Sequence, residues 1–565
     1  MAGRDGRRLK RVVKSAKRPE SIAAGLSWAL LLFFFAYPLV LLLLKGFGLP
    51  GRPTLGPYRG LLWNPLGWEA LRNTLLVGAT TTLLSLVSGA TLAWLAARSD
   101  IPGKRVLRAM VFLTFATPPY IGTLGWIQAL GHSGWLNLLL MRAFGLAHPP
   151  IEIYSLPGIA MVMGLYFYPL VFWATEGALL RLDPVYEEEA ALSGAGRGKV
   201  LFKVVLPMIL PALLSGGLLV FMHSLSCFAV AAELGLPRRR YLLVTLVYSA
   251  LSHYDVKGAC ALSSVLVALS GGAFLLRRSL LGNADGGVRA EGGRARAMEL
   301  GALRVPVGFL ALAFAAVVAL LPLLSLVGTS LVRAWGLPLK PGNLTPANYL
   351  ELFRNSLVAR AIRNSLGFAG LAAGISTLLA LGIGYLAERT RLRGRRALEL
   401  VTALPLAVPG PVLALALILA FARPPLALYN TPWIIVLAYT VAFTPIALLT
   451  VSGGLRTVEG ELEEAAWTMG ASRLQGLRRV LLPLLGKEVL AGWILVFLMA
   501  LREIPLSLML HTRGTETVGV VLFSFRDTLG VEVTAALAVV VMAITLAGRL
   551  WVAGIERRLW GKGGV

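Results

Sequence analysis

Long apolar runs separated by short polar loops dominate the pattern along the chain. Clear examples lie at 22–44, 305–327 and 533–554. Runs of about 20 apolar residues are long enough to cross the roughly 30 Å hydrocarbon core of a bilayer as helices. The pattern therefore predicts an all-α polytopic membrane protein with about twelve transmembrane helices. They are placed at 22–44, 71–97, 108–130, 156–180, 211–234, 259–279, 305–331, 361–387, 398–421, 432–455, 487–510 and 531–554.

Composition agrees with this interpretation. The chain has 565 residues, of which 57% are hydrophobic, and a mean hydropathy of +0.74. A net charge of +26 would suggest nucleic acid in a soluble protein, but here the basic residues lie mainly in short loops between the spans. The positive-inside rule explains them, so no nucleic-acid partner is expected. The basic residues before position 21 place both termini in the cytoplasm, and Arg238–Arg240 is a local exception.

Metal and cofactor chemistry has little support in the sequence. Only two cysteines occur, and the five histidines are scattered. They form no metal-binding spacing, so we expect neither a metal site nor a cofactor. The first apolar run is too long for a signal peptide and has no A-x-A-like cleavage site, so it is predicted to be a retained span.

The chain repeats itself. LRNTL at 71–75 matches IRNSL at 362–366, and WLAARSDIPGKR at 94–105 matches YLAERTRLRGRR at 385–396. A Gly-, Arg- and Ala-rich segment at 281–299 lies between the two halves and has the composition of a flexible linker. Equal orientation of the halves predicts two parallel six-helix repeats. The predicted division is a basic N-terminus 1–21, a first half 22–280 with its core at 60–280, a linker 281–304, and a second half 305–565 with its core at 350–555.

A second match joins 187–207 to 463–483, with about 15 extra residues between the two matches in the first half, near an external loop at 131–155. At first sight 187–207, EEEAALSGAGRGKVLFKVVLP, is similar to a phosphate-binding loop. That motif needs a glycine where Ser193 stands and a Ser or Thr where Val200 stands. We therefore expect no ATP hydrolysis and no catalytic residue in this chain.

The physical pattern of 459–483 predicts two short helices joined at a glycine. Four glutamates between 459 and 464 favour a helix start, because the helix dipole stabilises acids there. Gly470 permits a sharp turn, arginines alternate with leucines after it, and Pro483 is expected to stop the second helix. One such loop can be an interfacial helix. Two loops at matching places predict two docking points for a two-fold symmetric partner.

These loops resemble the signature of permease subunits of bacterial ATP-binding-cassette importers. The pattern is Glu-Ala-Ala, three residues, Gly, and a hydrophobic-Leu-Pro ending; it is close at 464–483, whereas the first loop has Glu188-Glu189-Ala190 at its start. The fused pair of domains, with LREIPLSLML at 501–510 and GTETVGVVLF at 514–523, is similar to the ferric iron branch. Related branches carry thiamine, polyamines or sulfate, and these solutes stay open as alternatives.

The resemblance implies a function and its partners. The chain would pass a solute, ferric iron in this branch, from an external binding protein to the cytoplasm across the bacterial inner membrane. Two copies of a separate ATPase subunit would dock on the two loops. The resemblance assigns this coupling role to Glu188, Glu189, Gly194, Ala195 and Pro207, and to Glu464, Ala465, Gly470, Ala471 and Pro483.

Ionisable residues inside spans are candidates for the solute path. Arg502 and Glu503 lie within the eleventh predicted span, and we assign them to that path. An ion-coupled secondary transporter is the alternative from another class, since it would also have about twelve helices in two parallel halves. A membrane scaffold is a further alternative, but it explains neither the repeat nor the paired loops.

Overall fold

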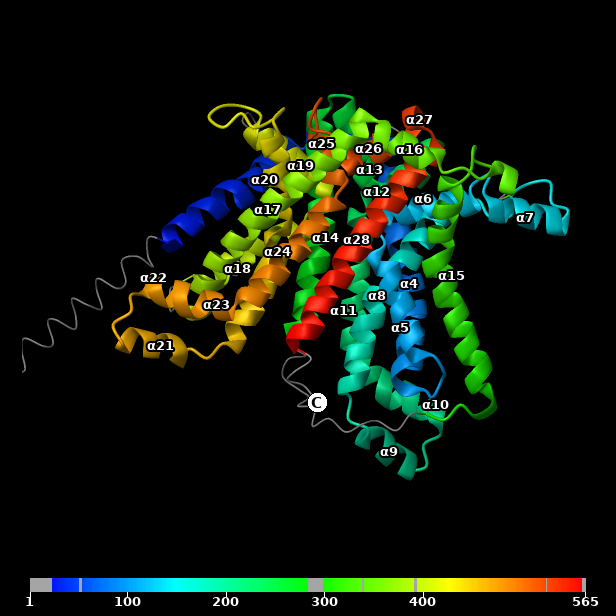
Figure 1. Cartoon of the computed structure of the whole chain (residues 1–565), viewed down its shortest axis with the longest axis horizontal. Helices are drawn as coiled ribbons and strands as arrows, with labels where there is room; N and C mark the ends of the chain where they lie inside the picture. Colours follow the sequence, from blue (N-terminus) through cyan, green and yellow to red (C-terminus); the bar gives the residue numbers. More distant parts are fainter. Residues whose placement is uncertain are drawn as a thin grey trace, which may run out of the picture. The chain divides into compact units, whose positions relative to one another are not determined.

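The computed structural model describes residues 23–49, 53–282, 298–337, 340–390, 394–524 and 526–560. Helices dominate these ranges, which hold no β-sheet and only two isolated bridges, Ser99 to Met298 and Val332 to Leu344 (Figure 1). The predicted basic N-terminus and most of the predicted linker lie outside the described residues.

The predicted all-α polytopic architecture is confirmed. Within the described ranges, nine helices are long and apolar enough to cross a membrane, or up to twelve if each of three bent helix pairs counts as one span. The nine are Ala23–Gly46, Pro65–Arg98 (α4), Leu156–Arg181 (α8), Gly198–Ser226, Val256–Leu280, Gly301–Ser330, Ser356–Arg389 (α17), Pro432–Thr457 (α20) and Val531–Gly548.

The third and ninth predicted spans are not straight helices. α5 (Lys104–Ala116) meets the next helical segment, which starts with α6 (Pro119–Leu130), at 102°, and the segment Arg395–Ala407 meets α19 (Gly410–Phe421) at 113°. The breaks lie at Pro118 and Pro409, which occupy matching places in the repeat. Thr117 and Val408 before them are extended, because a proline disfavours the helical conformation of the preceding residue.

The fifth and eleventh predicted spans each combine two helices. α11 (Leu206–Ser226) ends at Cys227, and α12 (Phe228–Gly235) follows it. α24 (Gly486–Leu501) ends at Arg502, and α25 (Pro505–Leu510) begins three residues later. Hydrophobicity is continuous across the first break, whereas Arg502 and Glu503 lie in the second one, where they were assigned to the interior of a single span.

Contacts divide the chain into two compact units. One comprises Met1–Arg52, Asn355–Phe525 and Ala547–Val565, and the other comprises Pro53–Arg354 and Arg526–Leu546. The first helix of the chain therefore belongs to the unit that holds most of the second half, where the rings of Phe33 and Phe34 contact Phe421. α15 (Arg304–Ser330), the leading helix of the second half, likewise packs against α5 and α6. The helix at Ala23–Gly46 and α15 therefore each pack in the unit formed mainly by the other half of the sequence.

Each unit has the same kind of helix contact at its centre. In one unit the Ser85 hydroxyl on α4 donates to the Gly164 carbonyl on α8 at 3.0 Å. In the other unit Ser376 on α17 donates to the Thr440 carbonyl on α20 at 3.4 Å. Small residues permit this close approach. A Cβ at Gly89, for example, would lie 2.6 Å from the Tyr168 carbonyl oxygen.

Candidate functional site

Two loops have the predicted arrangement of short helices. The first loop, 183–207, contains α9 (Val185–Leu192) and α10 (Arg197–Val200) (Figure 1). The second loop, 459–483, contains α21 (Glu461–Thr468) and α22 (Arg473–Gly476). Each loop follows a long helix, α8 or α20, and leads into the next apolar segment. The two loops thus occupy equivalent places in the repeat.

A glycine in the left-handed conformation ends the first short helix of each loop. The φ angle is +82° at Gly194 and +89° at Gly470. The next amide closes the turn, with Ala195 N donating to Ala190 O and Ala471 N donating to Ala466 O, both at 3.0 Å. This is the Schellman arrangement of a helix C-terminus. Because no other group lies within 4 Å of a Cβ built on either glycine, backbone conformation and not space requires glycine.

Two arginines that the sequence analysis did not select hold these loops. Arg98 ends α4; its Nη2 donates to the Leu182 carbonyl at 2.9 Å and lies 3.2 Å from Glu187 Oε1. Leu182 is the residue that follows α8, so one guanidinium joins α4, the end of α8, and α9.

The second half repeats this arrangement. Arg389 ends α17, and its Nη2 donates to the carbonyls of Leu455, at 2.8 Å, and of Val458, the residue after α20. Its Nε lies 3.2 Å from Glu463 Oε1. The sequence repeat aligns Arg98 with Arg389 and Glu187 with Glu463. We name each group of arginine, carbonyl and glutamate an arginine clasp.

The two clasps differ in which partner is exposed. The Arg98 side chain is 5% exposed and Glu187 is 30% exposed. Arg389 is 16% exposed, whereas Glu463 is 3% exposed. Burial raises the pKa of Glu463 above its ordinary value, while the nearby charge of Arg389 opposes that rise. Removing one partner of a buried pair costs about 3 to 5 kcal/mol, so the second clasp is the more sensitive one.

The acidic residues assigned to coupling are available at the surface. Glu188, Glu189 and Glu464 are exposed, as is Ala465, whereas Ala195 and Ala471 are half-buried in the turns. The glutamate that makes the structural contact in each loop is therefore the one immediately before Glu188 or Glu464. An exposed acidic surface is left free for a partner protein.

The helix of the second loop ends at Leu484, one residue after Pro483, and the next helix starts at Gly486 at an angle of 65° to it. The expected stop at Pro483 is therefore correct to within one residue. Pro207 instead lies inside a continuous helical segment, Gly198–Ser226. A π-helical turn precedes each proline: η2 (Leu201–Val205) and η7 (Leu477–Leu481). The wider π turn accommodates a proline ring that would otherwise clash with the carbonyl four residues earlier.

Glu503, assigned to the solute path, caps a helix. Its carboxylate accepts hydrogen bonds from the amides of Leu506, at 2.9 and 3.0 Å, and Ser507, at 3.2 Å. These are orphan donors at the start of α25. The carboxylate lies close to Gly410, at the break before α19. A solute-path role for Glu503 stays a prediction.

Arg502 and two further acidic residues, Glu176 and Glu233, differ in whether they have partners. One terminal nitrogen of Arg502, Nη1, is buried without a hydrogen-bond partner among the described residues. Glu233 accepts from the Tyr120 hydroxyl at 3.1 Å, and Glu176 pairs with Arg108 at 2.7 Å. Across the described ranges, no three His, Cys, Asp or Glu side chains form a group that could hold a metal ion.

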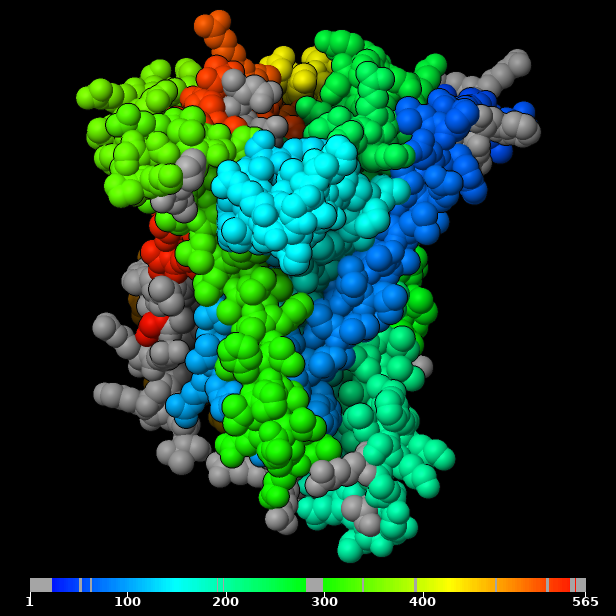
Figure 2. All heavy atoms as spheres, turned by 90° about the vertical axis from the view of Figure 1, so that its right-hand side faces the viewer, coloured from blue at the N-terminus to red at the C-terminus, as the bar shows by residue number. Residues whose placement is uncertain are grey.

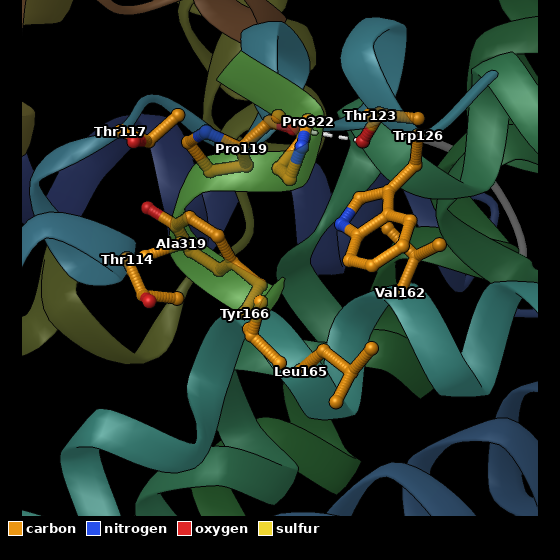
Figure 3. A pocket seen from close by; sticks show the side chains of 12 residues that line it. Thr114, Thr117, Pro119, Thr123, Trp126, Val162, Leu165, Tyr166, Ala319 and Pro322 are labelled. Atoms are coloured by element: carbon orange, nitrogen blue, oxygen red, sulfur yellow. Dashed lines mark hydrogen bonds between the residues drawn. The ribbon is translucent and has the colours of Figure 1, made fainter. Parts of the chain in front are cut away.

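A small, mostly apolar cavity with a few hydroxyl groups lies at the first helix break (Figure 3). Thr114, Thr117 and Tyr166 line it, together with Ala319 and Pro322 of α15. Two of its hydroxyls satisfy the main chain at the break: Thr117 donates to Leu113 O at 3.0 Å and Thr123 donates to Pro119 O at 2.7 Å. The volume of about 20 Å³ holds a single water molecule. In this conformation the cavity is too small for a transported solute.

Known proteins provide an independent comparison. Residues 89–336 and 380–561 match the family described as binding-protein-dependent transport system inner membrane component, and each matched segment contains one of the two loops. A putative ferric transport system permease protein of Haemophilus influenzae is 28% identical over 503 residues, which cover 87% of this chain and 78% of that protein.

Two further relatives differ in the solute that their names mention. A ferric transport system permease protein of Actinobacillus pleuropneumoniae is 28% identical over 501 residues, covering 87% of this chain and 72% of that protein. A putative 2-aminoethylphosphonate transport system permease protein of Salmonella paratyphi A is 28% identical over 259 residues, covering 46% of this chain and 89% of that protein.

Proposed function

The chain belongs to the family of binding-protein-dependent transport system inner membrane components, and we propose that, as the permease of an ATP-binding-cassette importer, it carries ferric iron. The duplicated loop with its arginine clasp is the observation that supports the importer mechanism. Support for iron comes from the ferric permeases, which resemble this chain over most of its length. The phosphonate relative matches less than half of it.

The two loops are the proposed docking sites for two ATPase subunits. Each loop offers an exposed acidic helix followed by a rigid turn, at Gly194 or at Gly470. Such a surface suits a groove with basic residues at its edge. With docking on the cytoplasmic side, both termini are proposed to be cytoplasmic, as the positive-inside rule also predicts.

The arginine clasps are the proposed connection between docking and transport. Movement of α9 or α21 with an ATPase subunit would pull on Glu187 or Glu463, and through the paired arginine on α4 or α17. Because each arginine also holds the carbonyl end of α8 or α20, two long helices would respond together. The chain itself has the role of converting this movement into a change of access across the membrane.

Iron coordination is proposed to lie mainly in the external binding protein. The carboxylate of Glu503 is already engaged by its own main chain. Ferric iron, a hard cation, binds best to several oxygen ligands that converge on it. We therefore propose that iron contacts this chain only transiently.

The test is transport by the whole assembly in proteoliposomes. The chain is reconstituted with its ATPase and its binding protein, and uptake of radiolabelled ferric iron is measured with and without ATP. We expect ATP-dependent iron uptake, with little uptake of thiamine, polyamine, sulfate or 2-aminoethylphosphonate. Preferential uptake of one of those solutes would overturn the iron assignment. Uptake driven by an ion gradient without the ATPase would instead support a secondary transporter.

A further inference from the structure

A groove separates the short helix α7 (Trp135–Phe144) from α15. It has a volume of about 450 Å³ and lies at the end of its unit opposite α9. Figure 2 shows α7 in cyan beside the upper part of α15 in green. The walls are mostly apolar; α7 contributes Trp135, Leu139 and Arg142, and α15 contributes Leu324 and Gly328.

Hydrogen bonds hold α7 in place above this groove. The indole nitrogen of Trp135 donates to the Ser325 hydroxyl of α15 at 2.9 Å. The buried amide of Asn137 donates to the carbonyls of Leu130, at 2.6 Å, and Ile151, at 2.9 Å. These contacts join α7 to the chain before and after it, so the groove is a built feature of the fold.

The groove continues an exposed apolar surface of α15. α15 belongs to a segment long and apolar enough to span a membrane. Leu310, Val317 and Leu324 recur every seven residues on it, and each side chain is more than half exposed. Residues at this spacing lie close to one line along a helix. This line of apolar side chains leads from the membrane-spanning part of α15 into the groove at Leu324.

The polar end of the groove carries a positive charge. Arg142 lies in the last turn of α7 and lines the groove, and it forms no ion pair within the described parts of the chain. Trp135 and Trp335 also line the groove. Tryptophans are typical of the membrane-water interface, where phosphate groups of lipids also lie. Arginine binds phosphate oxygens through two parallel hydrogen bonds.

We propose that this groove is a phospholipid site, with an acyl chain between α7 and α15 and the lipid phosphate at Arg142. The lipid belongs to the leaflet on the side opposite the first loop. It fills apolar space that would otherwise face water beneath α7, and it thereby stabilises the packing of α7 on α15. The site is independent of the transported solute.

Native mass spectrometry of the detergent-purified chain tests the site, with phosphatidylglycerol added at rising concentration. The wild-type chain is expected to retain one tightly bound lipid. Arg142→Gln and Leu324→Trp should each weaken retention by roughly tenfold, since one removes the charged hydrogen bonds and the other fills the groove.

Matched controls lie outside the groove. Arg354→Gln changes an exposed arginine in the last turn of α16 (Ala347–Arg354), and Val305→Trp enlarges an exposed residue of α15 that lies about five turns from Leu324 and off the line of Leu310, Val317 and Leu324. Both controls should retain lipid as the wild type does. Equal retention by all five proteins, or equal loss in the controls, would overturn the proposal.

A fluorescence experiment locates the lipid. The two native cysteines, Cys227 and Cys260, are buried, so Leu139→Cys offers an exposed thiol for labelling. In nanodiscs, lipids with a quencher on the acyl chain should quench the label, and Leu324→Trp should reduce that quenching at least twofold. Quenching by aqueous iodide alone would show that the groove is filled with water. Unchanged lipid quenching in the Leu324→Trp background would show that the label contacts the ordinary bilayer. Either result would contradict a lipid site in the groove.

Discussion

The first and second loops share one geometry but distribute burial differently. Both have a Schellman turn at a positive-φ glycine and an arginine that reaches a carbonyl and a glutamate. In the first loop the arginine is the more deeply buried partner, whereas in the second loop it is the glutamate. The two loops therefore keep the same contact between helices but bury different partners, and we expect the contact to contribute differently to stability in each loop.

Packing inside the second loop is a further feature to compare. In the second loop the indole ring of Trp467 lies against Gly476, where an added Cβ would be 3.2 Å from Nε1. Because this contact lies inside the second loop, we expect variants of that loop to be the more severe.

The largest expected effect comes from Arg389→Ala compared with Arg98→Ala. Loss of Arg389 leaves Glu463 buried without its charged partner, which should destabilise the chain by about 3 to 5 kcal/mol. Loss of Arg98 leaves the half-exposed Glu187 and an unsatisfied Leu182 carbonyl, at about 1 to 3 kcal/mol. Thermal unfolding in detergent and solute uptake in vesicles measure both.

The double variant Arg389→Met, Glu463→Leu is the control for the second clasp. It removes the buried charges together and should recover part of the lost stability while uptake stays impaired, because the helices are no longer tied. Equal stability losses in the two single variants would contradict the proposed difference between the clasps.

The next effect is that of valine at the two turns. Gly470→Val and Gly194→Val force a β-branched residue into the left-handed region, at a cost of about 1 to 2 kcal/mol each. We expect weaker co-purification of the ATPase and lower uptake, more so for Gly470. Gly198→Val in α10 is the control, because that glycine has no positive φ and open space around its Cβ. A Gly198 variant as defective as the Gly470 variant would remove the turn from the explanation.

Charge reversal of exposed glutamates in the two loops should have little effect on stability. It should have a clear effect on docking of the ATPase. Glu464→Lys and Glu188→Lys alter exposed residues in the first turn of α21 and α9, so stability should fall by only about 1 kcal/mol or less, through the lost interaction with the helix dipole. Association with the ATPase should weaken and its salt dependence should change. Titration of the ATPase at two ionic strengths measures this. Unchanged binding by both variants would show that the acidic surface is not the docking surface.

The smallest effect is expected from the prolines, and here the two loops should agree. Pro207→Ala and Pro483→Ala remove the steric reason for the π turns η2 and η7. Pro207 lies inside a helical segment and Pro483 lies one residue before a helix end, so alanine fits the backbone at both places and stability should change by less than about 1 kcal/mol in either loop. Uptake assays should show little loss. A severe defect in only one loop would mean that its π turn has a role that the other lacks.

Much of the fold and part of the site follow from sequence because their signals are local. Apolar run length identifies membrane helices, and a glycine after an acidic helix identifies the turn at Gly470. The clasps escaped prediction because Arg98 and Glu187 are far apart in the chain. A usable signal was present, since the match of WLAARSD with YLAERTR aligns Arg98 with Arg389 and places a charged residue at the end of each helix.

The helix breaks escaped prediction for another reason. Hydropathy is an average over a window, and it is equally high on both sides of Pro118 and of the residues between α24 and α25. The aligned prolines at 118 and 409 were visible, but a span can also contain a proline without breaking, as α8 does at Pro169. Periodicity likewise identifies a helix without specifying which helix it will pack against.

The helix at Ala23–Gly46 packs with the unit that holds most of the second half, and this has a consequence for biogenesis. The helix at Ala23–Gly46 finds partners such as Phe421 only after most of the chain has left the ribosome. At roughly 5 to 20 residues per second, the delay amounts to some tens of seconds. During that time the first inserted helix has to wait in the bilayer without its native neighbours. We therefore expect this helix to pack against its native partners only after the second half has been inserted into the membrane. A truncated product that contains only the first half would leave this helix without those partners.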